Sequence, residues 1–313
     1  MLTHRLFDPA ALSGKRILIT GGATGLGRGI AGHLVGHGAE VHLWGRRPAL
    51  LARAVEELGE RAHAQVVDLR DEARVELAVE EIWTEHGPLT GLVNNAAANF
   101  VVQTKDLSPR GFDAVTSTVM RGSFVTTVAC GRRWIAEGRP ASVVSNLTTW
   151  VWTGSAFVTA AAMAKTAVHA MTMSLAVEWA RYGIRVNAVA PGPIPTDFAW
   201  EMLSPTAASA VGATQVANVP AGRFGTVDEL GNLLVLLLSD GCDYLTGATI
   251  PIDGAQHLAG PSTFAEMTAL SEEEWQAIRD RSQAVTAASR AQQRADPEEV
   301  PSSGGAEPDD GTR

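Results

Sequence analysis

Lys165 is the one residue of formal charge in the stretch AAAMAKTAVHAM (160–171), where it lies among small and apolar side chains. A lysine in such a helix is either solvated or part of a ligand site. Residues four apart share a helix face, so Ala161 and His169 are its neighbours. His169 could titrate near neutral pH. However, it lies about 12 Å along the axis from Ala161, so we expect it to be structural.

A glycine-rich turn near the start of the chain is typical of phosphate binding. The motif TGGATGLG (20–27) places Gly21, Gly25, Leu26 and Gly27 between an apolar run and a helical pattern. Glycines allow the backbone to approach a pyrophosphate, and the helix N-terminus supplies free N–H groups. Its spacing differs from the general G-x-G-x-x-G fingerprint, and an ordinary tight turn is the alternative. We predict a dinucleotide site.

The residues that follow the second predicted strand indicate which dinucleotide binds. An NAD site places an acid there to bind the ribose 2′-hydroxyl. This chain has Arg46 and Arg47 instead, and guanidinium groups suit a 2′-phosphate. A solvated basic loop is the alternative. We therefore predict NADP(H) as the cofactor.

Short β-branched runs alternate with longer helical patterns along the chain, which is typical of βαβ units. We expect an α/β fold with a doubly wound parallel sheet of seven strands (Rossmann-type) in a single domain. The predicted strands cover residues 16–20, 40–44, 64–68, 91–95, 142–146, 185–190 and 248–253.

The boundaries follow from composition. We expect an N-terminal extension (1–13), a Rossmann-type domain (14–257), a helical C-terminal extension (258–288) and a disordered acidic tail (289–313). In the extension, Ser271 and Glu274 have the spacing of a capping box. The segment 196–225 is expected to be mobile and to lie where ligands enter such sheets.

Composition and charge exclude several classes of protein. The formal net charge of −9 argues against nucleic-acid binding. The longest apolar run is too short to span a bilayer. No targeting segment is visible, and the two cysteines have no metal-ligand spacing. We expect a cytoplasmic protein with a small-molecule substrate, no metal and no membrane partner.

These motifs together resemble the short-chain dehydrogenase/reductase superfamily over residues 14–256. The shared features are TGGATGLG, Asp68, NNAA (94–97), Lys165 and PGPIPT (191–196). The resemblance implies that Asp68 contacts the adenine, that Asn95 supports the cofactor and that Lys165 binds the ribose. It also implies that the residues Pro191, Gly192, Ile194 and Thr196 hold the nicotinamide, and that the chain forms a homotetramer.

A closer resemblance is to the 2,4-dienoyl-CoA reductases, carried by NNAAANF, LAVEWARYGIRVNAVAPGPIPT, GRFGTVDELGNLLVLLLSD and EEEWQAI. It implies NADPH-dependent reduction of a conjugated system in which Asn99, Lys165 and a tyrosine organise the substrate carbonyl.

The chain departs from this pattern at the proton donor. The superfamily has Tyr-x-x-x-Lys, whereas Ala161 stands four residues before Lys165. The dienoyl-CoA reductases place the tyrosine upstream, where ungapped spacing puts Trp150 here, and the usual serine maps close to Thr148. The two tyrosines of the chain, Tyr182 and Tyr244, map away from the site. An indole N–H donates a hydrogen bond but does not ionise usefully.

Trp150 and Trp152 lie in TTWVWTGS, on the loop that the resemblance places opposite the nicotinamide. We expect Trp150, with Phe100, Trp152, Ala161, Phe198 and Trp200, to line the substrate pocket. Packing beneath the segment 196–225 is the alternative for the two tryptophans.

Three functional hypotheses follow. The first is an NADPH-dependent reductase with an atypical active site that acts on an apolar molecule with a conjugated C=C, quinone-like or iminium group. Such electrophiles do not leave a localised alkoxide without a donor. The second is elimination, isomerisation or cyclisation with NADP(H) bound but not consumed. The third, a non-catalytic subunit, is disfavoured because the nucleotide motifs are intact.

Overall fold

The computed structural model describes residues 7–99, 101–196, 216–260, 267 and 270–295. The chain divides after residue 261 into two units, and the first unit contains the whole sheet. Among the described residues, no helix is long and apolar enough to cross a membrane.

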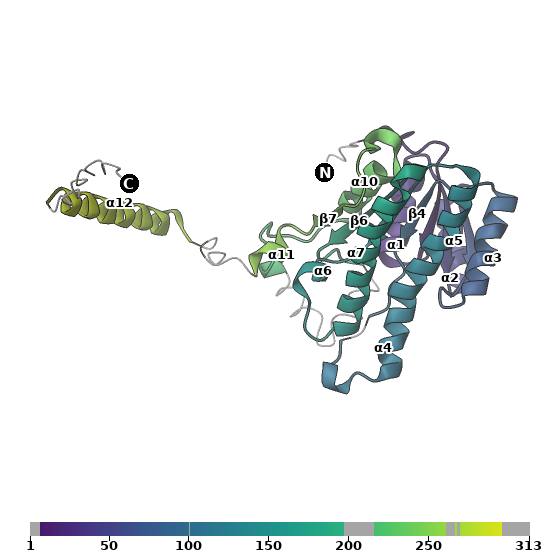
Figure 1. Cartoon of the computed structure of the whole chain (residues 1–313), viewed down its shortest axis with the longest axis horizontal. Coiled ribbons are helices and arrows are strands. Elements are labelled where there is room, and N and C mark those ends of the chain that lie inside the picture. The colour runs from purple at the N-terminus through teal and green to yellow at the C-terminus, as the bar shows by residue number, and fades with distance from the viewer. Residues whose placement is uncertain (1–6, 100, 197–215, 261–266, 268–269, 296–313) are drawn as a thin grey trace, which may run out of the picture. The chain divides into compact units, whose positions relative to one another are not determined.

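Seven parallel strands form one sheet in the order β3-β2-β1-β4-β5-β6-β7. This confirms the predicted fold class (Figure 1). The strands are β1 (Arg16–Thr20), β2 (Glu40–Gly45), β3 (Ala62–Val66), β4 (Gly91–Asn94), β5 (Ala141–Asn146), β6 (Ile184–Pro191) and β7 (Thr249–Ile252).

Helices cover both faces of the sheet because successive strand side chains point to opposite sides. In β1, Ile17 and Ile19 belong to one hydrophobic cluster, and Leu18 belongs to the other. The first cluster is covered by α1 (Gly25–Gly36), α2 (Pro48–Leu58) and α10 (Val227–Leu238). The second is covered by α3 (Glu72–Glu85), α5 (Gly122–Glu137) and α7 (Thr159–Trp179), which lie along one face in Figure 1.

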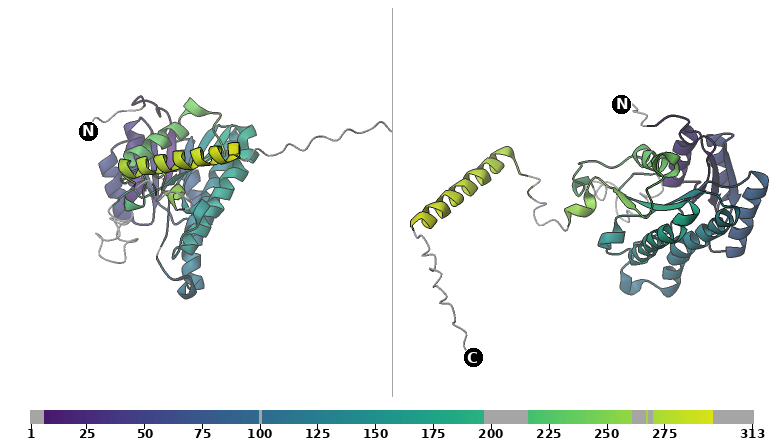
Figure 2. Two further views of the ribbon diagram at one scale, coloured as in Figure 1. Left: turned by 90° about the vertical axis from the view of Figure 1, so that its left-hand side faces the viewer. Right: turned by 45° about the horizontal axis from the view of Figure 1, so that its top comes forward.

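Shorter elements complete the first unit. They are α4 (Pro109–Thr116), the π-helical turn η2 (Ser117–Arg121) that joins α4 to α5, α6 (Trp150–Thr153), α11 (Gln256–Ala259), and the 3₁₀ turns η1 (Thr104–Asp106), η3 (Ala180–Tyr182) and η4 (Asp240–Cys242). Figure 2 shows the sheet enclosed by its helices from two further directions.

The predicted strand boundaries lie within two residues of the observed ones. The third strand runs from Ala62 to Val66 rather than from 64 to 68, because its pairing with β2 starts at Ala62. Asp68 therefore lies in the loop beyond the strand.

The second unit contains α12 (Glu272–Ala295). Its predicted capping box is confirmed, since Ser271 N donates to Glu274 Oε2 and Glu274 N donates to Ser271 Oγ. The helix runs to Ala295, past the predicted boundary at residue 288, because the alanine- and glutamine-rich segment after 288 favours helix. The rest of the predicted tail, 296–313, lies outside the described residues.

The sheet reverses its strand order between β1 and β4, which are neighbours although two strands separate them in sequence. At such a point the loops after adjacent strands diverge and leave a crevice at the carboxyl edge. This topology brings the glycine-rich turn beside the loops after β4, β5 and β6.

Candidate cofactor and active site

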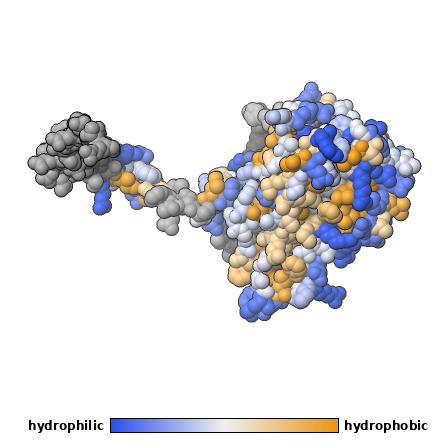
Figure 3. All heavy atoms as spheres, viewed as in Figure 1, coloured by the Kyte–Doolittle hydropathy of each residue, from blue (hydrophilic) through white to orange (hydrophobic). Residues whose placement is uncertain are grey.

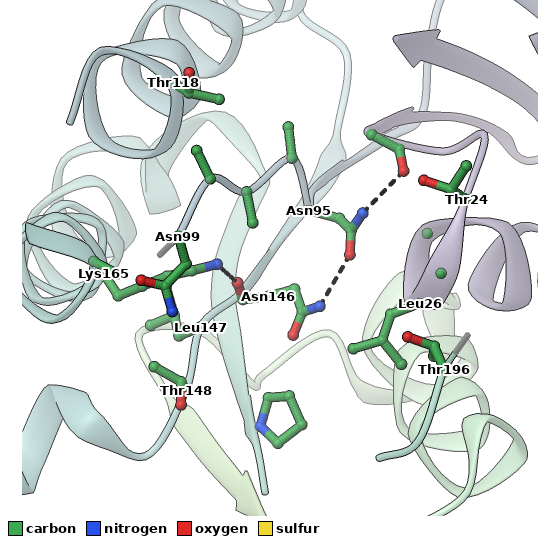
Figure 4. Close-up of a pocket in the computed structure, with 18 of the residues that line it drawn as sticks. Thr24, Leu26, Asn95, Asn99, Thr118, Asn146, Leu147, Thr148, Lys165 and Thr196 are labelled. Atoms are coloured by element: carbon green, nitrogen blue, oxygen red, sulfur yellow. Dashed lines mark hydrogen bonds between the residues drawn. The ribbon is translucent and has the colours of Figure 1, made fainter. Parts of the chain in front are cut away.

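A cavity of about 970 Å³ lies at the carboxyl edge of the sheet. Its lining comes from the loops after strands β1 to β6, with further residues from the start of α1 and from α4, η2, α6, α7 and α11. Figure 4 shows Thr24, Leu26 and Thr196 on one side and Asn99, Thr148 and Lys165 on the other. Topology therefore unites most of the predicted site residues in one cavity.

Asn95 holds the glycine-rich turn against the neighbouring loops. Its side-chain Nδ2 donates to Thr20 O at 3.0 Å and to Gly21 O at 3.3 Å, and its Oδ1 accepts from Asn146 Nδ2 at 3.0 Å (Figure 4). One amide thus joins the loops after β1, β4 and β5. Its expected role in supporting a bound cofactor stays a prediction.

The turn itself leaves no room for larger residues. A Cβ at Gly27 would lie 2.2 Å from Gly21 O and 2.6 Å from Asn95 Nδ2. Gly21 and Gly25 have φ of +66° and +53°, which glycine adopts without the strain of other residues. The backbone, together with the N-terminus of α1, is therefore shaped to receive a phosphate group.

Thr196, in the loop after β6, has a hydroxyl group that is free to bind a ligand in the cavity. Its Oγ1 is buried without a hydrogen-bond partner among the described residues. A Cβ at Gly25 would lie 3.5 Å from this oxygen. Buried hydroxyls are nearly always paired, so the orphaned Oγ1 fits a ligand that bridges the loops after β1 and β6. The residues Pro191, Gly192 and Ile194 line the same side.

Three arginines line the part of the cavity beside the glycine-rich turn, which we call its nucleotide end. Arg46 and Arg47 line it as predicted, and Arg47 Nη2 lies 3.5 Å from Thr24 Oγ1. Arg70 also lines it, although sequence reasoning missed this residue. The one available signal was its position two residues beyond Asp68.

Asp68 is not among the lining residues and is paired with Arg70. Arg70 Nε donates to both carboxylate oxygens, at 2.9 and 3.1 Å. The Arg70 guanidinium lowers the pKa of Asp68, with a smaller contribution from Arg46. The predicted contact of Asp68 with adenine therefore stays a prediction, and its observed role is to position Arg70.

Lys165 lies on α7 with its ammonium directed at β5. Nζ donates a hydrogen bond to Asn146 O (Figure 4). Burial lowers the pKa of Lys165 to about 8, because a charged amine loses solvation there. The side chain is therefore not the solvated lysine that the alanine-rich sequence allowed.

Polar groups from two other loops accompany Lys165. Asn99 follows β4 and Thr148 follows β5, and both line the cavity near the lysine (Figure 4). Asn146 Oδ1 is buried without a partner among the described residues. Thr118, in the π-helical turn η2, also lines the cavity. Sequence reasoning missed Thr118, because its segment reads as continuous helix and nothing local in the sequence indicates the π-helical turn.

Ala161, one helical turn before Lys165, is surrounded by apolar side chains. Ala161 is 4% exposed and packs with Val115 and Val119, and Trp150 packs against this cluster and lines the cavity. Among the described lining residues there is no tyrosine, histidine or carboxylate.

The two tyrosines lie elsewhere, as predicted. Tyr182 is in η3 beside Arg181, and Tyr244 is fully exposed near η4. His169 is also outside the lining, where its Nδ1 hydrogen-bonds to Thr249 Oγ1 at 2.8 Å. This contact agrees with a structural histidine.

The predicted aromatic wall is only partly present. Trp150 lines the cavity, but Trp152 does not: its ring lies 5.1 Å from that of His257 and 6.3 Å from that of His169. The short helix α6 turns the two tryptophans to different sides, so the prediction for Trp152 is wrong. Phe100, Phe198 and Trp200 lie outside the described residues.

A doubly wound parallel sheet, a glycine-rich turn at its switch point and a cavity at its carboxyl edge define a dinucleotide-binding protein. Comparison with known proteins agrees. Residues 21–257 match the family model described as Enoyl-(Acyl carrier protein) reductase. The chain belongs to this family, within the short-chain dehydrogenase/reductase superfamily, whose members use NAD(H) or NADP(H).

Two curated relatives extend the match. An uncharacterized oxidoreductase of Caenorhabditis elegans is 38% identical over 253 residues, which is 79% of this chain and 81% of the relative. A probable 2,4-dienoyl-CoA reductase of Bacillus subtilis is 35% identical over 249 residues, 78% of this chain and 97% of the relative.

Solved structures show the same fold with either nucleotide. A putative 2-deoxy-D-gluconate 3-dehydrogenase from Agrobacterium tumefaciens with bound NADP has a TM-score of 0.71 at 32% identity, covering 80% of this chain and 99% of that one. A 3-ketoacyl-(acyl-carrier-protein) reductase from Brucella melitensis complexed with NADH has a TM-score of 0.72 at 27% identity, covering 79% and 99%.

Proposed function

We propose that this chain is an NADP(H)-dependent reductase of an apolar molecule that carries a conjugated C=C, quinone-like or iminium group. The observation that supports this proposal is the composition of the cavity. Arginines line its nucleotide end, and Lys165, Asn99 and Thr148 line the other end. The similarity to a probable 2,4-dienoyl-CoA reductase supports the conjugated substrate among these choices.

The choice of NADP(H) over NAD(H) rests on charge. Arg46 and Arg47 follow β2 at the place where an NAD site has an acid. A 2′-phosphate carries up to two negative charges and binds guanidinium groups through charge-assisted hydrogen bonds. Arg70 lines the same region, but its charge is paired with that of Asp68, so the preference rests on Arg46 and Arg47.

The other end of the cavity suits a substrate that can spread negative charge. NADP(H), when bound, would supply a hydride to an electrophilic carbon. In a conjugated thioester or ketone the displaced electron pair then moves to the carbonyl oxygen. The Asn99 amide N–H and the Thr148 hydroxyl can donate hydrogen bonds to that oxygen, and water can deliver the proton to carbon afterwards.

An unconjugated ketone would need a stronger acid at the same moment. Its reduction leaves an alkoxide whose charge is localised on one oxygen. By their spacing from Lys165, Ala161 and Trp150 stand at the two places where the resemblance implies a tyrosine, and neither supplies an ionisable proton. We propose that the active site is atypical for this reason, and that the ammonium of Lys165 binds the ribose.

Apolar residues that remain exposed on the helices support the proposed homotetramer. Phe124 on α5 and Met163 and Val177 on α7 are 53%, 53% and 84% exposed. Figure 3 shows apolar residues among hydrophilic ones on the face of the first unit that α5 and α7 cover in Figure 1. We expect size-exclusion chromatography with light scattering to give four chains per particle.

The function is tested by following NADPH absorbance with matched substrates. We expect a 2,4-dienoyl thioester to be reduced with one NADPH consumed per product, and the corresponding saturated 3-keto thioester to react far more slowly. Product formed from the dienoyl thioester with NADPH unchanged would overturn the redox proposal. Equal rates for both thioesters would overturn the proposed substrate class.

A further inference from the structure

A second cluster of ionisable side chains lies at the amino edge of the sheet, opposite the cavity. Glu40 begins β2, His63 is the second residue of β3, and His86 caps the C-terminus of α3. Glu40 Oε1 lies 3.7 Å from His63 Nε2 and 4.0 Å from His86 Nδ1. One ligand atom from each residue lies within 4.8 Å of the other two.

These separations are close to those in a metal centre. Around a tetrahedral Zn²⁺ with bonds of about 2.0–2.1 Å, ligand atoms lie about 3.3 Å apart. The side chains of Glu40, His63 and His86 are 28%, 34% and 29% exposed. They can therefore close on an ion by small rotations, and solvent can reach the site.

The surroundings of Glu40 hold the carboxylate in place. Arg16 Nε donates to Oε1 at 2.8 Å and Arg16 Nη2 donates to Oε2 at 3.1 Å, while His42 Nε2 lies 3.1 Å from Oε1. The Arg16 hydrogen bond, with help from His42, lowers the pKa of Glu40 to about 2. The carboxylate is thus ionised and oriented before any ligand arrives.

The imidazoles of His63 and His86 lie beside a third ring, that of His42. Burial, followed by the neighbouring His86, lowers the pKa of His63. Burial also lowers the pKa of His42 to about 4, so this ring stays neutral beside the cluster. The ring centroids of His63 and His86 lie 4.2 Å apart, and that of His42 lies 5.0 and 4.7 Å from them. The three rings therefore lie close enough together for the imidazoles of His63 and His86 to approach one ion.

We propose that Glu40, His63 and His86 form a Zn²⁺ site with water in the fourth position. Two imidazoles and one carboxylate are a ligand set that suits zinc, whereas Mg²⁺ and Ca²⁺ prefer oxygen ligands alone. Coordination at Oε1 replaces one of its two hydrogen bonds, from Arg16 or His42.

The Arg16 guanidinium sets the strength of binding. It cancels the charge of Glu40 and repels the ion, so we expect affinity in the micromolar range rather than that of a closed structural site. The bound ion links β2, β3 and the end of α3. It therefore stabilises the fold at the edge remote from the cofactor, and this inference does not depend on the proposed reductase activity.

The test is calorimetric titration of ZnCl₂ into the full-length chain, without a histidine tag and stripped with a chelator. We expect one Zn²⁺ per chain, no heat with MgCl₂, and a higher Tm with zinc than without it. The double substitution His63→Gln and His86→Gln should weaken zinc binding at least tenfold. Glu40→Gln should do the same, and Arg16→Gln should tighten binding.

A second histidine pair provides the control. His33 on α1 and His37, which caps the C-terminus of that helix, have ring centroids 4.7 Å apart. The substitution His37→Gln removes one of these rings and leaves the proposed site untouched. Zinc affinity that is unchanged in this control supports the proposal. Affinity that falls in the control, or that is equal in wild type and the His63/His86 variant, overturns it. Circular dichroism of each variant separates lost binding from lost fold.

Discussion

At the nucleotide end of the cavity, Asn95 joins three loops, and a Cβ at Gly27 would collide with backbone. At the other end, the apolar side chains of Ala161 and Trp150 pack in one cluster and line the cavity, where we propose that they replace a tyrosine. The first region is constrained by main-chain geometry, which few residue types satisfy. The second is defined by side chains projected into a preformed space, where a single substitution changes the chemistry without changing the fold.

The largest expected effect is a loss of NADPH binding when the backbone packing of the glycine-rich turn is disturbed. In Gly27→Ala the added methyl group lies 2.2 Å from Gly21 O, which the turn cannot accommodate without moving. We expect NADPH affinity, measured by fluorescence titration, to fall by more than about 100-fold, as befits overpacking that costs roughly 3 kcal/mol.

Gly36, at the end of the same helix, is the matched control. A Cβ there meets nothing within 4 Å. Gly36→Ala should leave NADPH affinity unchanged and should not lower Tm, because alanine favours helix more than glycine does. An equal loss of binding in both variants would show that the turn is not the cause.

At the other end of the cavity, by contrast, a substitution should add an activity, the reduction of simple ketones. Ala161→Tyr places a phenol one turn before Lys165, and a general acid contributes roughly 100-fold or more to a rate. We expect NADPH-dependent reduction of a simple ketone to rise by about that factor. Ala161→Phe has nearly the same bulk without the hydroxyl group, and equal ketone reduction by the two variants would refute the missing-acid interpretation.

Discrimination between nucleotides should depend on the exposed arginines. Replacing both Arg46 and Arg47 with alanine should weaken NADPH binding by about 30-fold and leave NADH binding nearly unchanged, since charged hydrogen bonds contribute about 1.5 kcal/mol and exposure reduces this. Arg53→Ala removes a charge on α2 that pairs with Glu57 and should change neither affinity. Parallel losses for both nucleotides would disprove phosphate recognition.

Loss of the buried ammonium should have a moderate effect. Lys165→Met keeps the length of the side chain and removes the ammonium that we propose binds the ribose, so we expect NADPH affinity to fall about tenfold. Affinity equal to that of wild type would remove Lys165 from the cofactor site.

The pH dependence of binding should show the smallest effect. Burial lowers the pKa of Lys165 to about 8, so the free protein loses this positive charge as pH rises through that value. If the ammonium binds ribose, NADPH affinity should decline between pH 7 and pH 9, by less than about tenfold. Lys165→Met should give a flat profile over the same interval, and a decline in both proteins would assign the effect to another group.

Local patterns predicted the strands and the glycine-rich turn well. Runs such as residues 16–20 alternate between two buried faces, and a positive φ at Gly21 and Gly25 admits few other residues. Sequence patterns predicted less well the direction in which a side chain points. Trp150 and Trp152 are two residues apart, and only the turn of α6 decides that one lines the cavity and the other packs beside His257.

The amino-acid sequence by itself determined the fold class, the dinucleotide motif and the presence of an alanine four residues before Lys165, because each depends on neighbours in the chain. The tertiary structure decided that Arg70 joins the nucleotide end, that Thr118 lines the cavity and that Glu40, His63 and His86 meet at the opposite edge. Those residues are brought together by strand pairing and helix packing, whose register depends on the whole core rather than on spacing in the sequence.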